Sequence, residues 1–326
     1  MSYLVLARKW RPQSFDDVAG QEHVTETLKN AIRQSRVAHA FLFAGPRGVG
    51  KTTTARILAR ALNCAQGPTP EPCGVCDPCR EITAGTSLNV QEIDGASNRG
   101  IDQIRELRES VKYASTSRFK IYIIDEVHML TTEAFNALLK TLEEPPPHVI
   151  FIFATTERHK VPATIRSRCQ TYDFRRIAPA EIRLRLAKIA EAEGVSISPA
   201  GLHILARAAD GSLRDAQSLF DQVLAFAGST ITDEDLRSIL GTMDEAAVRD
   251  FARAILDQTP EPALEIIDRI AEDGRDLKVF TRDVVTRVRD LLIANAAGEK
   301  TGRFVDLTEG EVRDLVEESG RVPAET

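Results

Sequence analysis

Short runs of consecutive apolar residues recur through the first half of the chain, and segments with helical spacing separate them. The runs that we interpret as strands are 40–44, 120–126 and 149–154, and the more polar segments 88–94 and 170–174 are also interpreted as strands. Between them apolar residues repeat every three or four positions, as at Val24, Leu28 and Ile32. Buried strands that alternate with amphipathic helices are typical of a parallel sheet covered on both faces. An α/β domain is therefore predicted for the first half.

The second half has helical periodicity throughout, with glycine stops such as Gly194, Gly211 and Gly228. The predicted helices are 180–193, 199–209, 213–227, 233–240, 244–257, 261–273 and 276–296. We expect an α/β domain over 1–178, a small helical lid domain over 179–242 and an all-α third domain over 243–326. Because the end is polar and shows no compact cap, the third domain is expected to be truncated.

Composition limits the functional classes. The chain has 326 residues, of which 43% are apolar and 28% charged, as in an ordinary soluble globular protein of two or three domains. A formal net charge of -6 excludes binding of nucleic acid by bulk positive charge, but it leaves room for a local basic surface. The first residues contain neither a signal h-region nor a membrane span, so a cytoplasmic location without a membrane partner is expected.

A glycine-rich motif follows the first strand and opens a helix. It reads Gly45, Pro46, Arg47, Gly48, Val49, Gly50, Lys51 and Thr52, with Thr53 behind it. In this strand–loop–helix context the form G-x-x-x-x-G-K-T predicts that backbone N–H groups cradle phosphates, that Lys51 reaches the β- and γ-phosphates, and that Thr52 holds Mg²⁺. The alternative is a glycine turn that contains a lysine by chance. The full spacing and both flanks favour a site for ATP and Mg²⁺.

Two acids end the strand 120–126. Four apolar residues precede Asp125 and Glu126, which places them at the carboxyl edge of a parallel sheet, where ligands bind. We expect Asp125 to hold the Mg²⁺ shell and Glu126 to polarise the water that attacks the γ-phosphate. The alternative is surface charge. Thr155, at the end of the next strand, is a candidate γ-phosphate sensor or a strand-end threonine without a role.

A cysteine-rich segment follows the helix behind the glycine motif. Cys64, Cys73, Cys76 and Cys79 have the spacing C-x8-C-x2-C-x2-C within residues 64–79, which are too rich in Pro and Gly to predict helix or strand. Four thiolates suit a closed, structural Zn²⁺ site. An iron–sulfur cluster, whose bacterial spacing differs, and unliganded thiols are the alternatives. The fifth cysteine, Cys169, is interpreted as a buried side chain.

Residues outside these motifs complete the predicted nucleotide site. The basic lead before the first strand, with Arg8 and Val18 as its candidate contacts, is expected to fold over the nucleotide base; Trp10 is interpreted as a packed aromatic. Arg214 lies in the first turn of a predicted helix, where a cation opposes the helix dipole. That cost suggests contact with a phosphate, and a solvated arginine is the alternative.

Taken together, these motifs resemble the gamma/tau family of bacterial DNA polymerase III subunits, in the clamp-loader branch of AAA+ ATPases. The resemblance rests on the opening segment 3–22, the motif 45–52, the cysteine insertion, 125–130, 135–145, 167–169 and 211–216. It implies an AAA+ P-loop fold with strand order 5-1-4-3-2, a helical lid, and a third domain through which subunits form a collar. It also implies that Arg168 acts as an arginine finger in the site of an adjacent subunit.

The resemblance further implies an ATPase that loads the sliding clamp onto primed DNA, while another subunit polymerises. Its expected partners are the delta and delta-prime subunits, further gamma/tau copies, the sliding clamp, primer–template DNA and the replicative polymerase. Arg99 and Lys140 are candidate DNA contacts. A hexameric AAA+ motor such as a branch-migration helicase and a non-catalytic scaffold subunit are the alternatives; the cysteine insertion argues against the former, and the intact Lys51 and Glu126 argue against the latter.

Overall fold

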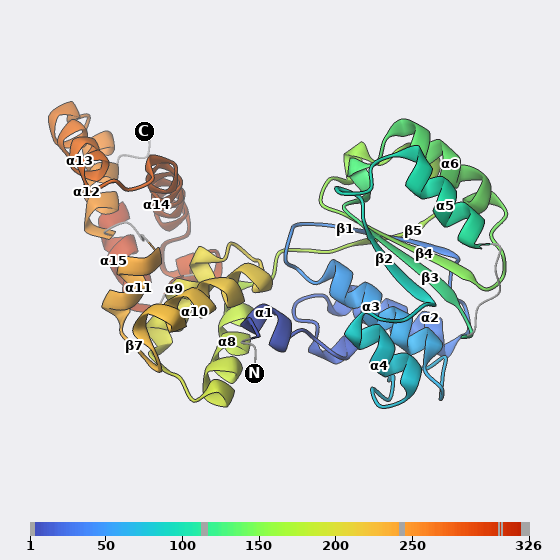
Figure 1. Ribbon diagram of the computed structural model, residues 1–326. Helices are drawn as coiled ribbons and strands as arrows, with labels where there is room; N and C mark the ends of the chain where they lie inside the picture. Colours follow the sequence, from blue (N-terminus) through green and yellow to red (C-terminus); the bar gives the residue numbers. More distant parts are fainter. Residues whose placement is uncertain (1–3, 112–116, 241–244, 306, 308, 321–326) are drawn as a thin grey trace. The chain divides into compact units, whose positions relative to one another are not determined.

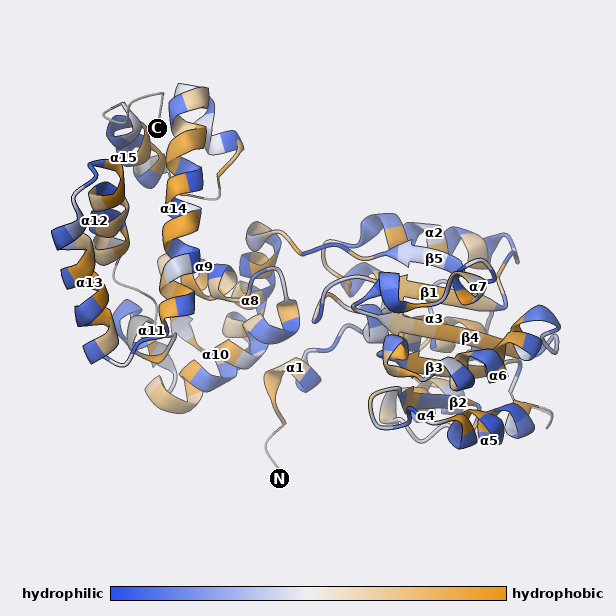
Figure 2. Cartoon of the chain, turned by 90° about the horizontal axis from the view of Figure 1, so that it is seen from above, coloured by the Kyte–Doolittle hydropathy of each residue, from blue (hydrophilic) through white to orange (hydrophobic). Residues whose placement is uncertain are grey.

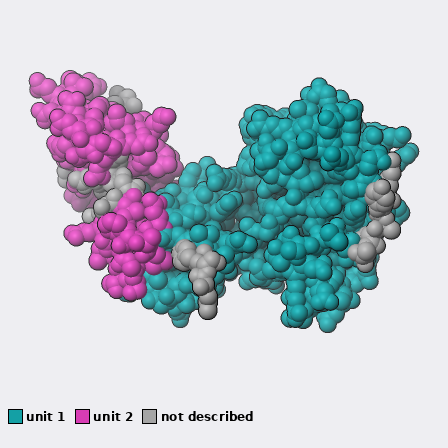
Figure 3. Space-filling model, in the orientation of Figure 1, with its two compact units in different colours: residues 1–221 teal, residues 222–326 magenta. Residues whose placement is uncertain are grey.

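The computed structural model describes residues 4–111, 117–240, 245–305, 307 and 309–320. The chain divides into two compact units, residues 1–221 and 222–326 (Figure 3). The expected boundary at 178/179 falls inside the first unit, which therefore holds the α/β part and the first helices that follow it. The expected boundary at 242/243 lies outside the described residues.

A five-stranded sheet forms the centre of the first unit (Figure 1). Its strands are β1 (Ala40–Ala44), β2 (Val90–Asp94), β3 (Lys120–Asp125), β4 (Val149–Thr155) and β5 (Gln170–Asp173). All neighbouring pairs are parallel, and the order β2-β3-β4-β1-β5 confirms the predicted order 5-1-4-3-2. The register places Ala44 beside Thr155 and Asp173, and Asp94 beside Asp125. The carboxyl ends of all five strands therefore meet at one edge.

Helices cover both faces of the sheet. One face buries apolar residues of α2 (Glu22–Arg33), α3 (Lys51–Asn63) and α4 (Asp77–Ala84). The other face buries residues of α5 (Ile101–Val111), α6 (Thr132–Glu143) and α7 (Ala163–Arg166). This three-layer packing explains the uninterrupted apolar runs of β1, β3 and β4, because a central strand between two helical layers has no solvent-facing side. Figure 2 shows the resulting apolar colour of the central strands.

Aromatic side chains fill the core between the sheet and the helices α5, α6 and α7. Tyr122 and Phe151 stack with ring centroids 5.5 Å apart, and Phe151 and Phe153 stack at 5.9 Å. All three are fully buried. Because Phe151 and Phe153 alternate along the central strand β4 and Tyr122 lies on its neighbour β3, they fix the register at the middle of the sheet. The carboxyl edge of this packed sheet carries the candidate site.

Further short elements and helices belong to the first unit. They are α1 (Leu6–Lys9), the 3-10 turns η1 (Phe15–Asp17), η2 (Val127–Met129) and η3 (Arg158–Lys160), the helices α8 (Pro179–Glu193) and α9 (Pro199–Ala208), and the strand β6 (Ser196–Ile197). The helix α10 (Leu213–Ala227) runs past the last residue of this unit. Gly194 ends α8 with a left-handed φ of 68°, as its position after the periodic segment predicts.

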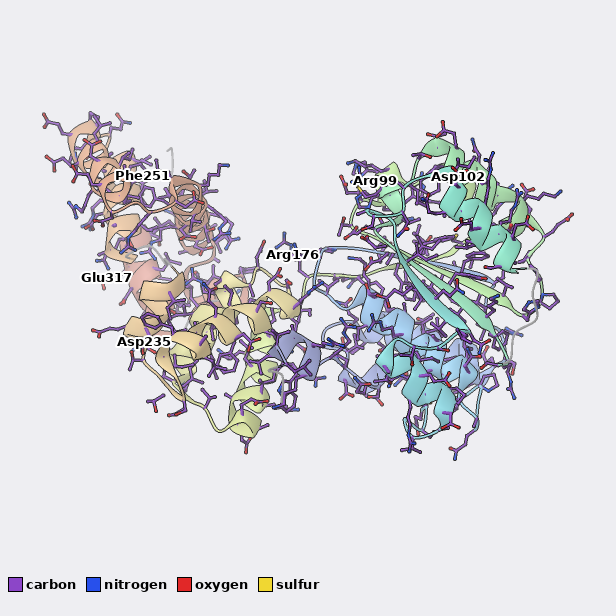
Figure 4. The ribbon with its side chains drawn as sticks, viewed as in Figure 1. Arg99, Asp102, Arg176, Asp235, Phe251 and Glu317 are labelled. Atoms are coloured by element: carbon purple, nitrogen blue, oxygen red, sulfur yellow. The ribbon has the colours of Figure 1, made fainter. Side chains whose placement is uncertain are left out.

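The second unit is helical. Its elements are β7 (Thr230–Ile231), α11 (Asp233–Leu240), α12 (Glu245–Leu256), α13 (Pro260–Glu272), α14 (Leu277–Ala297), η4 (Gly298–Arg303) and α15 (Glu309–Ser319). Buried residues of α12, α13 and α14, among them Phe280, form one cluster. Phe251, labelled in Figure 4, packs against it and meets Phe280 edge to face, with ring centroids 5.0 Å apart. Each helix contributes one apolar stripe, so the three must pack together to bury it.

The structure corrects two expectations. Residues 64–79 were expected to contain no helix, yet α4 begins at Asp77, because Pro78 is tolerated in a first turn, where its missing N–H is not needed. No compact cap was expected at the polar end of the chain, yet α15 buries Leu315 against Leu291 and Ala294 of α14; truncation of the third domain stays a prediction. Among the residues described, the helices are all too short or too polar to span a membrane.

Candidate functional site

The glycine motif connects β1 to α3 at the carboxyl edge of the sheet. Gly45, Gly48 and Gly50 have φ values of 150°, 73° and 105°, in the region that side chains disfavour. A Cβ atom at Gly45 would lie 2.3 Å from the Phe174 carbonyl oxygen, and one at Gly48 would lie 1.8 Å from Ser212 Oγ. The loop therefore requires glycine both for its curvature and for its close packing. This is the conformation that exposes successive N–H groups to an anion.

Lys51 and Thr52 begin α3 directly behind the loop. The ammonium group of Lys51 donates to the carbonyl oxygens of Gly45 and Pro46, at 2.8 and 2.7 Å. Burial lowers the pKa of Lys51, while the carboxylates of Glu126 and Asp125 act in the opposite direction. The ammonium thus lies inside the curl of the loop and near both acids. A phosphate held by the loop would meet this positive charge.

The acidic end of β3 meets the start of α3. Thr52 donates from Oγ1 to Asp125 Oδ2 at 2.7 Å, so a hydroxyl and a carboxylate from two elements converge on one point. Hard oxygen ligands of this kind are what Mg²⁺ prefers. Glu126 has a left-handed φ of 45°, which is uncommon for a residue with a side chain and is found preferentially at functional sites.

Glu126 is held by residues that sequence reasoning missed. Thr156 donates from Oγ1 to Glu126 Oε2 at 3.2 Å, and His128 Nδ1 lies 3.4 Å from the same oxygen. The His128 side chain is only 6% exposed and also contacts Glu157 and Thr155. The predicted sensor Thr155 is itself fully buried, and its hydroxyl accepts from the Glu157 N–H at 3.0 Å. The threonine that touches Glu126 is therefore Thr156, one residue further along.

The lead, which is the segment 4–18 before α2, and the start of α10 both lie close to the glycine loop. Val18 lies beside Gly50, whose added Cβ atom would be 3.4 Å from Val18 Cγ1. The backbone N–H of Arg214 donates to the Gly48 carbonyl oxygen at 3.4 Å, so the Arg214 side chain starts at the loop. Arg8 is exposed. Sequence reasoning did not select Arg11, whose pKa is lowered by burial and by the guanidinium groups of Arg56, Arg214 and Arg8.

These guanidinium groups come from three separate segments of the chain, the lead, α3 and α10, and Glu92 is the carboxylate that opposes them at Arg11. Glu92 is already paired with Arg56, whose Nε lies 2.6 Å away. An excess of positive charge therefore collects beside the loop that presents N–H groups. The arrangement suits a polyphosphate anion. Helical spacing gives no signal for such a cluster, because only the fold brings its members together.

Arg168 lies away from this site. It precedes β5, at the amino end of a strand parallel to β1, whereas the glycine loop follows the carboxyl end of β1. Four strand residues separate the two edges, roughly 13 Å at 3.3 Å per residue. The Arg168 guanidinium donates to the Thr164 carbonyl oxygen at 2.7 Å and pairs with Glu143 of α6, with its side chain 32% exposed. It therefore cannot reach its own glycine loop.

The candidate DNA contacts Arg99 and Lys140 are both exposed. Arg99 lies between β2 and α5 (Figure 4), and its carbonyl oxygen accepts from the Thr131 N–H at 3.1 Å, at the start of the helix that carries Lys140. Arg99 Nε donates to the Ala96 carbonyl oxygen at 2.9 Å. The loop before α5 is thereby joined to the start of α6, on the face of the sheet opposite α2 and α3.

The four cysteines of the insertion come together. Their Sγ atoms all lie within 4.8 Å of one another, with Cys64 and Cys79 buried. Hydrogen bonds from the backbone of Cys76 and Val75 lower the pKa of Cys73 to about 6, whereas burial raises the pKa of Cys79 to about 12. N–H groups also point at sulfur, from Ala65 to Cys76 and from Cys73 to Cys64, both at 3.5 Å. Four convergent cysteine sulfurs, which lose their protons when a metal binds, are the donor set that Zn²⁺ prefers.

Comparison with protein families divides the chain into three matches. Residues 20–178 match the family "DNA polymerase III, delta subunit" and residues 181–229 match "DNA polymerase III clamp loader subunit, ATPase lid domain". Residues 231–326 match "DNA polymerase III subunits gamma and tau domain III". DNA polymerase III subunit gamma of Buchnera aphidicola is 41% identical over 84% of this chain and 76% of its own length. The chain belongs to the gamma and tau family of DNA polymerase III subunits.

Other members of the gamma and tau family are longer. Subunit tau of Bacillus subtilis is 49% identical over 91% of this chain and 53% of its own length. Subunit tau of Salmonella typhimurium is 43% identical over 97% of this chain and 49% of its own length. The chain thus spans about half the length of these curated relatives.

Solved structures establish the fold independently. The RuvB Holliday junction branch migration motor of Thermotoga maritima matches with a TM-score of 0.54 and 21% identity, over 76% of this chain and 79% of that chain. At this identity the likeness concerns the fold alone, and it confirms the AAA+ fold predicted for this gamma and tau family member.

The cysteine cluster gives a first prediction. A closed site needs all four thiolates to hold its metal ion, and the bound ion stabilises the fold of the segment. Cys73→Ser should therefore remove bound Zn²⁺ from the purified chain and loosen residues 64–79. Cys169→Ser is the matched control, because Cys169 lies outside the cluster. Metal analysis by mass spectrometry checks both variants. Finding no zinc in the unsubstituted protein, or finding iron, would contradict the assignment.

Proposed function

We propose that this chain is an ATP-driven motor subunit of the DNA polymerase III clamp loader. The observation that carries the proposal is the meeting of Lys51, Thr52, Asp125 and Glu126 at one sheet edge, in a member of the gamma and tau family. ATP binding and hydrolysis would open the sliding clamp and load it on primed DNA. Polymerisation itself would belong to another subunit.

In this proposal the chain positions the phosphates and stabilises their negative charge. The N–H groups of the glycine loop and the Lys51 ammonium bind the phosphate oxygens, and Arg214 adds a cation from the other side of the loop. Mg²⁺, for which Thr52 and Asp125 are the proposed ligands, would neutralise phosphate charge. Glu126, oriented by Thr156 and His128, would accept a proton from the attacking water. Arg8 and Val18 would contact the nucleotide, and Thr155 would support the γ-phosphate side through His128.

The wider assembly is also part of the proposal. We propose an ATPase domain over 1–178, a lid over 179–242 and a collar-forming domain over 243–326, with a structural Zn²⁺ on Cys64, Cys73, Cys76 and Cys79. The partners would be delta, delta-prime and further gamma/tau subunits, the clamp, primer–template DNA and the replicative polymerase, in the cytoplasm. Arg99 and Lys140 would contact DNA phosphates without reading sequence.

A branch-migration motor is the second candidate, because the RuvB structures have the same fold. The identity to them is about 20%, whereas gamma and tau relatives reach 49%. The two functions differ in turnover. A loader hydrolyses ATP in bursts that require both clamp and primed DNA, whereas a translocating motor is stimulated by DNA alone.

The nucleotide site gives a second prediction, measured as ATP turnover in the reconstituted loader. Turnover should rise only when clamp and primed DNA are both present. Lys51→Ala should abolish ATP binding, because it removes the charge that the phosphates meet, whereas Glu126→Gln should keep binding and stop turnover. Near-normal hydrolysis by Glu126→Gln would exclude Glu126 as the residue that activates water, and full stimulation by DNA without clamp would favour the branch-migration motor.

Arg168 gives a third prediction. Since it lies at the opposite sheet edge from its own glycine loop, it is proposed to act on the nucleotide of a neighbouring subunit. Arg168→Ala should leave ATP binding intact and lower stimulated hydrolysis by about 10³–10⁵, the contribution of arginine fingers in phosphoryl transfer.

Mixed assemblies decide whether Arg168 acts on a neighbour. A subunit with Arg168→Ala placed beside one with Lys51→Ala should be active only at the interface where an intact Lys51 faces an intact Arg168. Hydrolysis that instead follows the Arg168 of the nucleotide-binding subunit itself would mean that the finger acts within one chain.

A further inference from the structure

The first described residues of the chain pack with the helix α8 rather than with the sheet. Figures 1 and 2 show α1 beside α8. Leu6 of α1 is buried, and its N–H donates to Asp221 Oδ2 at 2.7 Å, at the end of the first unit. The following residues cross back to the sheet, where Phe15 and Val18 belong to the core around α2 and α3. The lead, residues 4–18, therefore ties the helices after residue 178 to the sheet through noncovalent contacts, in addition to the covalent connection along 174–178.

Glu193, the last residue of α8, holds this lead with both carboxylate oxygens. Lys9 Nζ and Trp10 Nε1 each donate to it at 2.7 Å. The Glu193 side chain is 19% exposed, against 50% for Lys9. The hydrogen bond from Lys9 lowers the pKa of Glu193, so the carboxylate is ionised when it accepts the indole N–H. Hydrogen bonds to an ionised acceptor are stronger than neutral ones.

A second contact follows the same face of α8. Arg185 donates from NH2 to the Asp17 carbonyl oxygen at 2.7 Å, in the residue directly before Val18. Arg185 and Glu193 are eight residues apart, which places them on one side of the helix and about 12 Å apart along it. Between these two attachments the lead carries Arg11, which lies near Arg214 and Arg56, and it ends at Val18 beside Gly50. The helix α8 therefore holds the part of the lead that borders the glycine loop.

We propose that Glu193 is a positioning residue for nucleotide binding, because it fixes the lead to α8 so that both move as one body and keep Arg11 and Val18 against the bound nucleotide. The inference rests on the proposed ATP site. In this inference Trp10, the lone tryptophan of the chain, connects α8 to that site through its hydrogen bond to Glu193. Glu193 itself touches no residue of the glycine loop among its described contacts, so its effect must pass through the lead.

The test compares Glu193→Gln with Glu191→Gln in the same chain. Glu191 is an exposed carboxylate two residues earlier on α8 and controls for the loss of one charge. Binding of a non-hydrolysable ATP analogue with Mg²⁺ is measured by calorimetry, and Trp10 emission is recorded with and without the analogue. Thermal unfolding and zinc content verify that each variant is folded.

Glu193→Gln should weaken analogue binding by about tenfold, the change expected for a lost charge-assisted contact of about 1.4 kcal/mol. Trp10 emission should shift to the red before nucleotide is added, and its response to the analogue should fall. In the loader, KM for ATP should rise while kcat at saturation stays near that of the unsubstituted chain. Glu191→Gln should behave as the unsubstituted chain does, and Trp10→Phe, which removes the N–H donor, should weaken binding in the same direction.

Equal analogue affinity in Glu193→Gln and the unsubstituted chain would overturn the positioning role, and so would weaker binding that appears only with partial unfolding. A fall in kcat without a change in affinity would also overturn it. Absence of binding by the unsubstituted chain would instead contradict the ATP site itself, and the positioning role with it. The two failures are thus distinguished by the unsubstituted protein alone.

Discussion

The hydrogen bond between Thr52 and Asp125 joins the two halves of the proposed site. It forms because β1 and β3 both run parallel to β4 and end at the same edge, so that the first turn of α3 and the end of β3 face each other. This geometry also sets the position of the Lys51 side chain. Because Lys51 directly precedes Thr52 at the start of α3, its ammonium group enters the glycine loop. Glu126 follows too, as the residue after Asp125 turns into a left-handed conformation. A shift of β3 by one residue in its pairing would turn its side chains to the opposite faces of the sheet. Both acids would then leave the site.

Two groups of residues act on this edge from outside the sheet. Thr156 and His128 hold Glu126, and Glu157 in turn holds His128. Arg11, Arg56 and Arg214 add positive charge from the lead, α3 and α10, with Glu92 as partial compensation. The first group restricts the orientation of a carboxylate, whereas the second favours binding of an anion. The proposed hydrolysis needs both, because charge on the phosphates and the direction of the attacking water are set by different parts of the chain.

Much of the core could be predicted from the sequence, because strands buried on both faces leave uninterrupted apolar runs and the glycine motif has a fixed spacing. The order of the strands came from a family resemblance and is confirmed by the sheet. The helix α4 was missed because a segment rich in Pro and Gly can still start a helix at Asp77 when its proline falls in the first turn. Contacts such as those of Trp10 with Glu193, 183 residues apart, leave no periodic signal at all. The same is true of the guanidinium cluster at Arg11, whose members come from separate segments.

Asp125 and Thr52 are proposed to form a metal–nucleotide site. Replacing Mg²⁺ by Mn²⁺ makes it measurable by electron paramagnetic resonance, which follows the loss of free Mn²⁺ as ATP is added. The unsubstituted chain should take up a single Mn²⁺ with ATP, Asp125→Asn should lose most of this uptake, and Asp94→Asn should retain it, since Asp94 ends the neighbouring strand in register with Asp125 and bonds to Ser97 instead. Equal uptake by Asp125→Asn and the unsubstituted chain would contradict a metal-binding role for Asp125.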